Sequence, residues 1–136
     1  MSQIYVLDAF ALLAYLRGEP GAERVRDLLL RARSGEARLY LCLVNYGEVL
    51  YISERQGGRP AAEEAIRIID HLPLETVLAD RDLTFAAAHL KARYPISYAD
   101  AFAAALAQKL SATLVTGDPE FRKVEAVVEI EWLTNW

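Results

Sequence analysis

The chain lacks several features that would place it in a familiar class of protein. It has one cysteine, Cys42, so no disulfide can form within the chain. No uncharged apolar run approaches the roughly 20 residues needed to span a bilayer, and the first residues lack the basic start and apolar core of a signal peptide. We therefore expect a soluble protein of the reducing cytoplasm, with no membrane partner.

Positive charge is also scarce in this sequence. The 15 lysines and arginines are outnumbered by 19 acidic residues, which gives a formal net charge of −4. Proteins that bind nucleic acids usually carry a basic patch or an excess of positive charge. A role on a phosphate-rich substrate therefore needs a source of positive charge other than the overall composition.

Apolar residues, in contrast, are plentiful. They make up 54% of the 136 residues, which is enough to build a sizeable core and argues against disorder. No internal repeat, low-complexity tract or linker interrupts the sequence. The length suits one domain, and we expect it to extend over residues 1–136.

Short strand-like runs alternate with helix-like runs along the chain. The expected strands are residues 4–7, 39–42, 74–78, 113–116 and 127–130, with amphipathic or alanine-rich helical segments between them. Gly57-Gly58 and Pro60 should separate two of these helices. The alternation predicts an α/β fold in which helices cover both faces of a mostly parallel sheet of about five strands.

Four acidic residues hold special positions in this pattern. Asp8 follows the first strand, Asp118 follows the fourth, and Asp100 lies in the first turn of the helix that leads into the fourth. Glu48 lies in the helix after the second strand. Ligands of open α/β sheets bind beyond the carboxyl ends of the strands. If the first, second and fourth strands are neighbours, the four acids approach one edge of the sheet.

Each acid also has a purely structural interpretation. Asp8 and Asp118 could cap the helices that follow them, and Asp100 stands three residues after Ser97, as in a capping box. Capping does not account for Glu48, whose neighbours at helical spacing are mostly apolar. A carboxylate in such surroundings needs a partner, either a nearby arginine or a metal ion.

Several carboxylates that converge without lysines among them repel one another unless a cation neutralises them. Hard oxygen ligands favour Mg²⁺ or Mn²⁺. Such an ion can activate water and stabilise the attacking and leaving oxygens of a phosphodiester. It would also supply the positive charge that the composition lacks, so the pattern predicts a metal-dependent nuclease.

Four segments of the chain resemble the signature motifs of the PIN-domain family, and most closely those of VapC-type toxins of prokaryotic toxin–antitoxin pairs. The segments are VLDAFALLAYL, NYGEVLY, ISYADAFAAALA and LVTGDPEF. The resemblance covers essentially the whole chain. It implies a three-layer α/β/α sandwich and a Mg²⁺- or Mn²⁺-dependent endoribonuclease that cleaves RNA. It also implies a homodimer and a small antitoxin protein that covers the site.

The resemblance assigns roles to individual residues. Asp8, Glu48, Asp100 and Asp118 would hold the metal and orient the attacking water, while Thr116 and Asn45 would support the site. The chain departs from the family at one place, where a hydroxyl or amide side chain usually follows the first Asp. Ala9 and Phe10 stand here, so one hydrogen bond that helps tune metal affinity is missing.

Two other functions are compatible with the sequence. A receiver-like signalling module would also carry an acid after its first strand, with Asp80 after the third strand as its phosphorylation site and Thr116 at the end of the fourth strand. A PIN fold that has lost activity and only binds a partner would account for the Ala9-Phe10 departure.

Overall fold

The computed structural model describes residues 2–134, so residues 1, 135 and 136 of the expected domain lie outside the described residues. Strands and helices alternate along the chain as the apolar pattern predicts. In chain order they are β1 (Gln3–Leu7), α1 (Ala9–Arg17), α2 (Ala22–Arg33), β2 (Ala37–Cys42), α3 (Leu43–Asp70), β3 (Glu75–Val77), α4 (Arg81–Arg93), α5 (Tyr98–Leu110), β4 (Thr113–Thr116), the 3-10 helix η1 (Pro119–Val124) and β5 (Ile130–Trp132).

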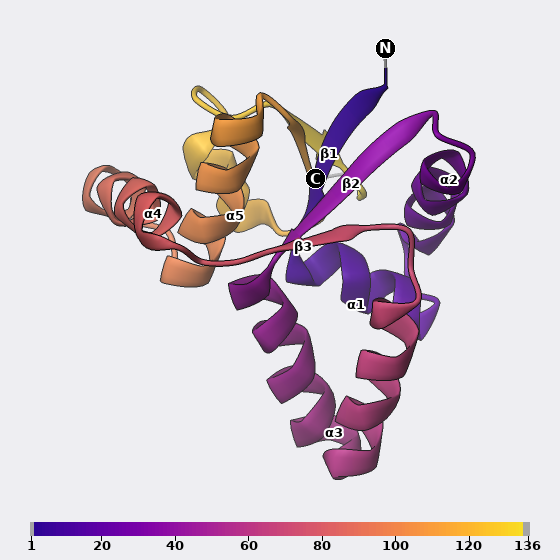
Figure 1. Cartoon of the computed structure of the whole chain (residues 1–136). Helices are drawn as coiled ribbons and strands as arrows, with labels where there is room; N and C mark the ends of the chain where they lie inside the picture. Colours follow the sequence, from indigo (N-terminus) through magenta and orange to yellow (C-terminus); the bar gives the residue numbers. More distant parts are fainter. Residues whose placement is uncertain (1, 135–136) are drawn as a thin grey trace.

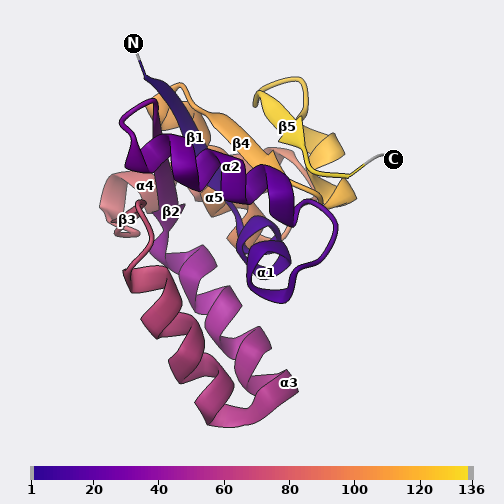
Figure 2. The same cartoon turned by 90° about the vertical axis from the view of Figure 1, so that its right-hand side faces the viewer.

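The strands form one parallel sheet in the order β3-β2-β1-β4-β5. Helices α1, α2 and α3 lie on one side of the sheet, while α4 and α5 lie on the other (Figures 1 and 2). The predicted α/β/α sandwich is therefore confirmed. No helix of residues 2–134 has the length and apolar character needed to cross a membrane.

Side chains of the central strands alternate between two separate cores. In β1, Val6 packs on the side of α4 and α5, whereas Tyr5 and Leu7 pack on the side of α1, α2 and α3. In β4, Leu114 packs on the side of α4 and α5, and Val115 packs on the side of α1, α2 and α3. Because successive side chains of a strand point to opposite faces, a continuous apolar run is what a strand covered on both faces requires.

Two helices carry marked sequence signals that the structure explains. Residues 101–107 of α5 are all buried, as expected for a helix that is apolar nearly all round. Helix α3 is broken at Gly58, whose φ of 75° suits glycine, and Pro60 follows in the first turn of the second arm. The two arms form a hairpin that projects beyond the carboxyl ends of the strands (Figure 1).

The last strand begins later than the sequence suggested. Strand β5 starts at Ile130, not at Val127, because the Val127 and Val128 amides both donate to the Val124 carbonyl at 3.0 Å and so belong to a turn. Val127 is also 40% exposed, so its apolar character does not mark a buried strand.

Candidate active site

The order of the strands creates a natural ligand site beside β1. The chain runs from β1 outward through β2 to β3, and then returns to β1's other side to build β4 and β5. The helices that connect β1, β2 and β3 lie on one face of the sheet, and those that lead into β4 and β5 lie on the other. This arrangement leaves a crevice at the carboxyl ends of β1 and β4. Asp8 follows β1 directly, and Asp118 follows β4 after Gly117. The condition that the first, second and fourth strands be neighbours is met.

Asp8 is a buried carboxylic acid, with only 3% of its surface exposed. As the N-cap of α1 it accepts a hydrogen bond from the Ala11 amide at 2.9 Å. Its second oxygen accepts one from the Thr116 hydroxyl of β4. Leu7 and Val115 are register partners in β1 and β4, which places the next residues, Asp8 and Thr116, at the same level of the sheet. The capping and the site interpretations of Asp8 are thus compatible.

Thr116 connects two of the acids. It is fully buried, and its hydroxyl oxygen also accepts the Asp118 amide at 3.1 Å. Asp118 in turn caps η1 by accepting the Glu120 amide at 3.0 Å. A single threonine therefore fixes the backbone of one acid and the side chain of another.

Helix α5 brings Asp100 to the same edge of the sheet. A helix that leads into a parallel strand begins at the carboxyl edge, and Asp100 lies in the first turn of α5. Ser97 caps this helix by accepting the Asp100 amide at 3.1 Å. The carboxylate of Asp100 lines the pocket described below.

Glu48 reaches the site from the first arm of α3. Asn45, which is fully buried one turn earlier, donates to the Glu48 carboxylate at 2.9 Å and to the Ala99 carbonyl at 3.1 Å. This amide links the helix that carries Glu48 to the residue before Asp100. The Asn45 side-chain oxygen is buried without a hydrogen-bond partner among the described residues.

These four acids line one pocket of about 160 Å³. Its other lining residues are all apolar: Ala9, Phe10, Leu13 and Ile52. No lysine or arginine lines it among residues 2–134, and none of the ion pairs in that part of the chain involves the four acids. The arginine partner that would give Glu48 a structural role is therefore not found within the described residues.

Burial and repulsion from neighbouring acids make the ionised forms of Asp8, Glu48 and Asp100 unfavourable. Burial, together with the nearby Asp100 and Asp118, raises the pKa of Asp8 from 3.8 to about 8, although the Thr116 and Ala11 hydrogen bonds oppose the shift. Burial and the charges of Asp118 and Glu48 raise the pKa of Asp100 to about 6. The pKa of Glu48 is also raised, mainly by burial. A positive charge in the pocket would stabilise the ionised carboxylates, and the described residues that line the pocket do not supply one.

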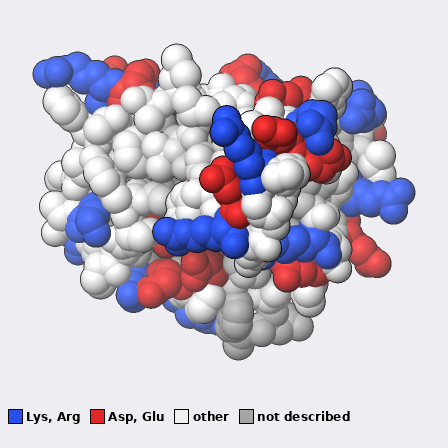
Figure 3. Space-filling view, turned by 90° about the horizontal axis from the view of Figure 1, so that it is seen from below, with Lys and Arg blue, Asp and Glu red and all other residues white. Residues whose placement is uncertain are grey.

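The face of the molecule seen in Figure 3 does not supply that charge as a continuous band. Figure 3 shows the end of the molecule from which α3 projects, and its lysine and arginine side chains form separate patches interleaved with acidic ones. This distribution agrees with the net charge of −4. The face seen in Figure 3 therefore carries no continuous basic band.

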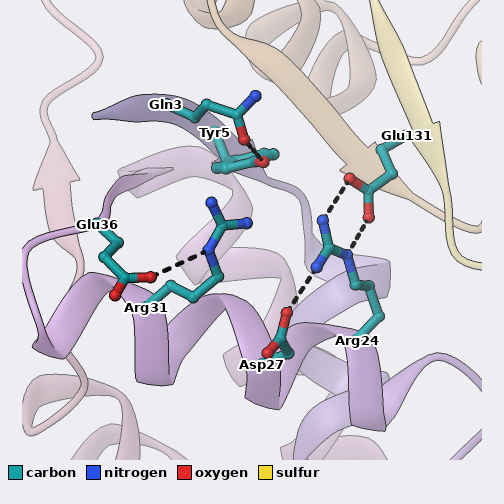
Figure 4. Close-up of polar contacts among 7 residues, drawn as sticks. All are labelled: Gln3, Tyr5, Arg24, Asp27, Arg31, Glu36 and Glu131. Atoms are coloured by element: carbon teal, nitrogen blue, oxygen red, sulfur yellow. Dashed lines mark hydrogen bonds and ion pairs between the residues drawn. The ribbon is translucent and has the colours of Figure 1, made fainter. Parts of the chain in front are cut away.

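Several acids elsewhere in the fold form ion pairs with arginines. Arg24 of α2 donates to both carboxylate oxygens of Glu131 in β5, at 2.6 and 3.0 Å, and also pairs with Asp27 at 2.6 Å (Figure 4). Arg31 and Glu36 form a further pair, 3.8 Å apart. The four pocket acids differ from these in having no cationic partner within the described residues.

The donors of the pocket fit a hard divalent cation. All four are carboxylates, the ligands that Mg²⁺ and Mn²⁺ prefer, and no softer donor lines the pocket within residues 2–134. As they stand, no three His, Cys, Asp or Glu side chains of the described chain are close enough together to hold a metal ion. A bound ion would have to draw the repelling carboxylates inward.

The sequence did not predict a role for Phe10 in this pocket. The sequence indicates only the loss of a hydroxyl at this position, whereas the Phe10 ring lines the pocket and lies against Gly117. A Cβ at Gly117 would lie only 2.2 Å from this ring. Its place two residues after Asp8, in the first turn of α1, was the available signal.

The receiver-like interpretation is wrong. Receiver domains have the flavodoxin-like strand order 2-1-3-4-5, whereas β3 lies here at the edge of the sheet, beside β2. Asp80, the proposed phosphorylation site, is exposed and caps α4 by accepting the Leu83 amide at 2.9 Å. It does not line the acidic pocket.

Solved structures with the same fold include complexes from toxin–antitoxin systems. The chain aligns with DNA-bound VapBC from Salmonella typhimurium at TM-score 0.75 and 16% identity, covering 98% of this chain and 100% of that one. It aligns with VapBC2 from Rickettsia felis, bound to a promoter DNA fragment, at TM-score 0.74 and 19% identity, covering 95% and 98%. It aligns with VapC20 from Mycobacterium tuberculosis, described as a Sarcin-Ricin loop cleaving toxin, at TM-score 0.69 and 18% identity. This alignment covers 93% of this chain and 96% of that one.

These identities show a shared fold and no more. A search of curated proteins returned no match. The PIN domain family model, in contrast, matches residues 5–127, a stretch that contains all four acids. The resemblance seen in the four motifs is thereby confirmed, and the chain belongs to the PIN-domain family.

Proposed function

We propose that this protein is a metal-dependent endoribonuclease, the toxin of a VapBC-type toxin–antitoxin pair. The observation that carries the proposal is the convergence of Asp8, Glu48, Asp100 and Asp118 on one pocket without a cationic partner among residues 2–134. Carboxylates kept together at this electrostatic cost are typical of functional sites. We propose these four acids as the catalytic and metal-holding residues.

A bound Mg²⁺ or Mn²⁺ would lower the pKa of water and offset the negative charge of the phosphodiester. The chain's own groups prepare the site for it. Thr116 and the Ala11 amide stabilise the ionised form of Asp8, and Asn45 holds the Glu48 carboxylate. Glu48, which lines the same pocket, would take a proton from the water whose oxygen bonds to phosphorus; the bond to the leaving oxygen breaks, and that oxygen takes a proton from solvent.

RNA as the substrate, and an antitoxin as the partner, are supported by the solved structures with this fold. The Mycobacterium tuberculosis protein is described as a toxin that cleaves the Sarcin-Ricin loop, and several others are VapBC complexes. We extend these properties to this chain as proposals: an RNA substrate, a cognate antitoxin, a homodimer and a cytoplasmic location.

A second candidate is a PIN-fold protein that binds a partner and has little activity. Two observations favour it: the missing hydroxyl at Ala9-Phe10, and carboxylates that are not assembled closely enough to hold an ion as they stand. It differs from the first candidate in a measurable way, because it requires no binding of Mn²⁺ at millimolar concentration.

The two candidates are separated by a cleavage assay on labelled structured RNAs and single-stranded DNA, with Mn²⁺ or with EDTA. We expect RNA cleavage that EDTA abolishes and that Asp100→Asn reduces at least 100-fold, on the order of the effect of losing one catalytic group. The matched control is Asp82→Asn, an exposed acid on α4 outside the pocket, which should keep full activity. Equal activity with Mn²⁺ and with EDTA would contradict the metal role, and cleavage of DNA alone would contradict the substrate.

A further inference from the structure

The acidic pocket has a second, apolar half. Alongside its four carboxylates it is lined by Ala9, Phe10, Leu13 and Ile52. A site that only had to hold a cation and a phosphate would gain nothing from an apolar wall, since both prefer polar surroundings. The combination suits a ligand that joins a charged group to a flat apolar one, and a nucleotide has this composition.

Phe10 is the one aromatic residue of that wall. Its ring lies in the first turn of α1, two residues after Asp8, and is partly exposed. It carries no hydrogen-bonding group, so it cannot read the polar edge of a base. A base can still stack on such a ring through its π-face, and every base has one.

The Phe10 ring packs closely against Gly117. A Cβ at this position would lie 2.2, 2.6 and 2.9 Å from three carbons of the Phe10 ring, so one side of the ring rests directly on the Gly117 backbone. Gly117 itself joins Thr116 to Asp118. The ring is thus held against the segment that carries two groups of the site, and it reaches the pocket from a fixed position.

We propose that Phe10 is a specificity-determining residue that stacks on the base next to the cleaved phosphate, so that the substrate must present an unpaired base there. The inference rests on the proposed nuclease function. The ring is in contact with the Gly117 segment and shares its pocket with all four acids, so a base on it would lie beside the phosphate that the acids serve. The alternative is that the apolar wall binds a side chain of an inhibitor protein. In that case the bases of an RNA would not contribute to its binding.

The test compares two ligands and a set of variants by fluorescence anisotropy, in Ca²⁺ to limit turnover. The probes are a six-nucleotide RNA of mixed sequence and a six-residue ribose-phosphate chain without bases. Phe10→Leu should weaken binding of the RNA about tenfold, the order expected for losing one base–aromatic stack. Binding of the abasic chain should change less than about twofold, because Leu keeps the apolar contact.

Two further variants serve as controls. Phe10→Tyr keeps an aromatic ring and should restore most of the RNA affinity. Phe85→Leu removes a phenylalanine that is 57% exposed on α4, outside the pocket, and should change neither affinity. Equal losses for both probes, or no loss for either, would overturn the stacking role while leaving the nuclease proposal intact. If the unaltered protein binds neither probe, the proposed function fails and this inference fails with it.

Discussion

Replacement of Asp8 by asparagine should stabilise the metal-free protein at neutral and alkaline pH. Asp8 is almost completely buried, and its pKa rises from 3.8 to about 8 on folding. Asparagine has the same shape and no charge. Its oxygen can accept from the Ala11 amide, and its NH₂ group can donate to the Thr116 hydroxyl oxygen, which reverses the bond that Thr116 donates to Asp8.

The size of the effect follows from proton binding. Between about pH 4 and pH 8 the unfolded chain has lost the Asp8 proton while the folded chain keeps it, so raising the pH favours the unfolded state. Each pH unit in this window lowers the free energy of unfolding by at most about 1.4 kcal/mol. Asparagine removes this dependence. The stability gained by Asp8→Asn over the unaltered protein should therefore grow by about 2 to 4 kcal/mol from pH 5 to pH 8.

Urea denaturation in EDTA at pH 5, 6.5 and 8 measures this gain directly. Asp82→Asn, on the exposed surface of α4, is the control, and its difference should stay within about 0.5 kcal/mol across the range. In Mn²⁺ the order should reverse, because the ion stabilises only the protein that retains Asp8. A pH-independent difference for Asp8→Asn, or a loss of stability at pH 8, would refute the reasoning.

Three further predictions concern the groups around Asp8. Thr116→Val removes the hydroxyl that serves Asp8 and should cost about 1 to 3 kcal/mol of stability in urea denaturation, with weaker Mn²⁺ binding; an unchanged protein would show that the hydroxyl is dispensable. Gly117→Ala should lower the free energy of unfolding by about 1 to 3 kcal/mol, because its Cβ meets the Phe10 ring. In a chain that already carries Phe10→Ala, the same Gly117→Ala change should cost much less; additive effects of the two substitutions would contradict the contact. Calorimetry at pH 7 in buffers of different ionisation enthalpy should show release of about one proton per Mn²⁺ bound, mainly from Asp8. Affinity should fall as the pH drops below about 8, and more steeply below about pH 6 as Asp100 also gains a proton; binding that is insensitive to pH would exclude these acids as ligands.

Much of the fold could be predicted from local patterns. Helix caps at Asp80 and Ser97, the break at Gly58 and the buried helix α5 all follow from residues close together in the chain. The approximate places of the strands followed from apolar runs. The start of β5 did not, because Val127 is apolar and β-branched yet belongs to an exposed turn.

The contacts that make the site depend on pairing between distant segments. The hydrogen bond between Thr116 and Asp8 joins residues 108 positions apart, and it exists because Leu7 and Val115 are register partners in neighbouring strands. Sequence reasoning could state that β1 and β4 should be neighbours but could not establish it. The packing of Phe10 against Gly117 also could not be predicted, because no spacing in the sequence indicates it.

The central claim is that the four carboxylates gather around a divalent cation, and a crystal structure grown in millimolar Mn²⁺ tests it most directly. Anomalous scattering should place one or more ions in the pocket, with carboxylate oxygens of Asp8 and of at least one of Asp100 and Asp118 within about 2.4 Å. An acidic pocket that holds no ion under these conditions, with manganese bound elsewhere or nowhere on the protein, would contradict the account.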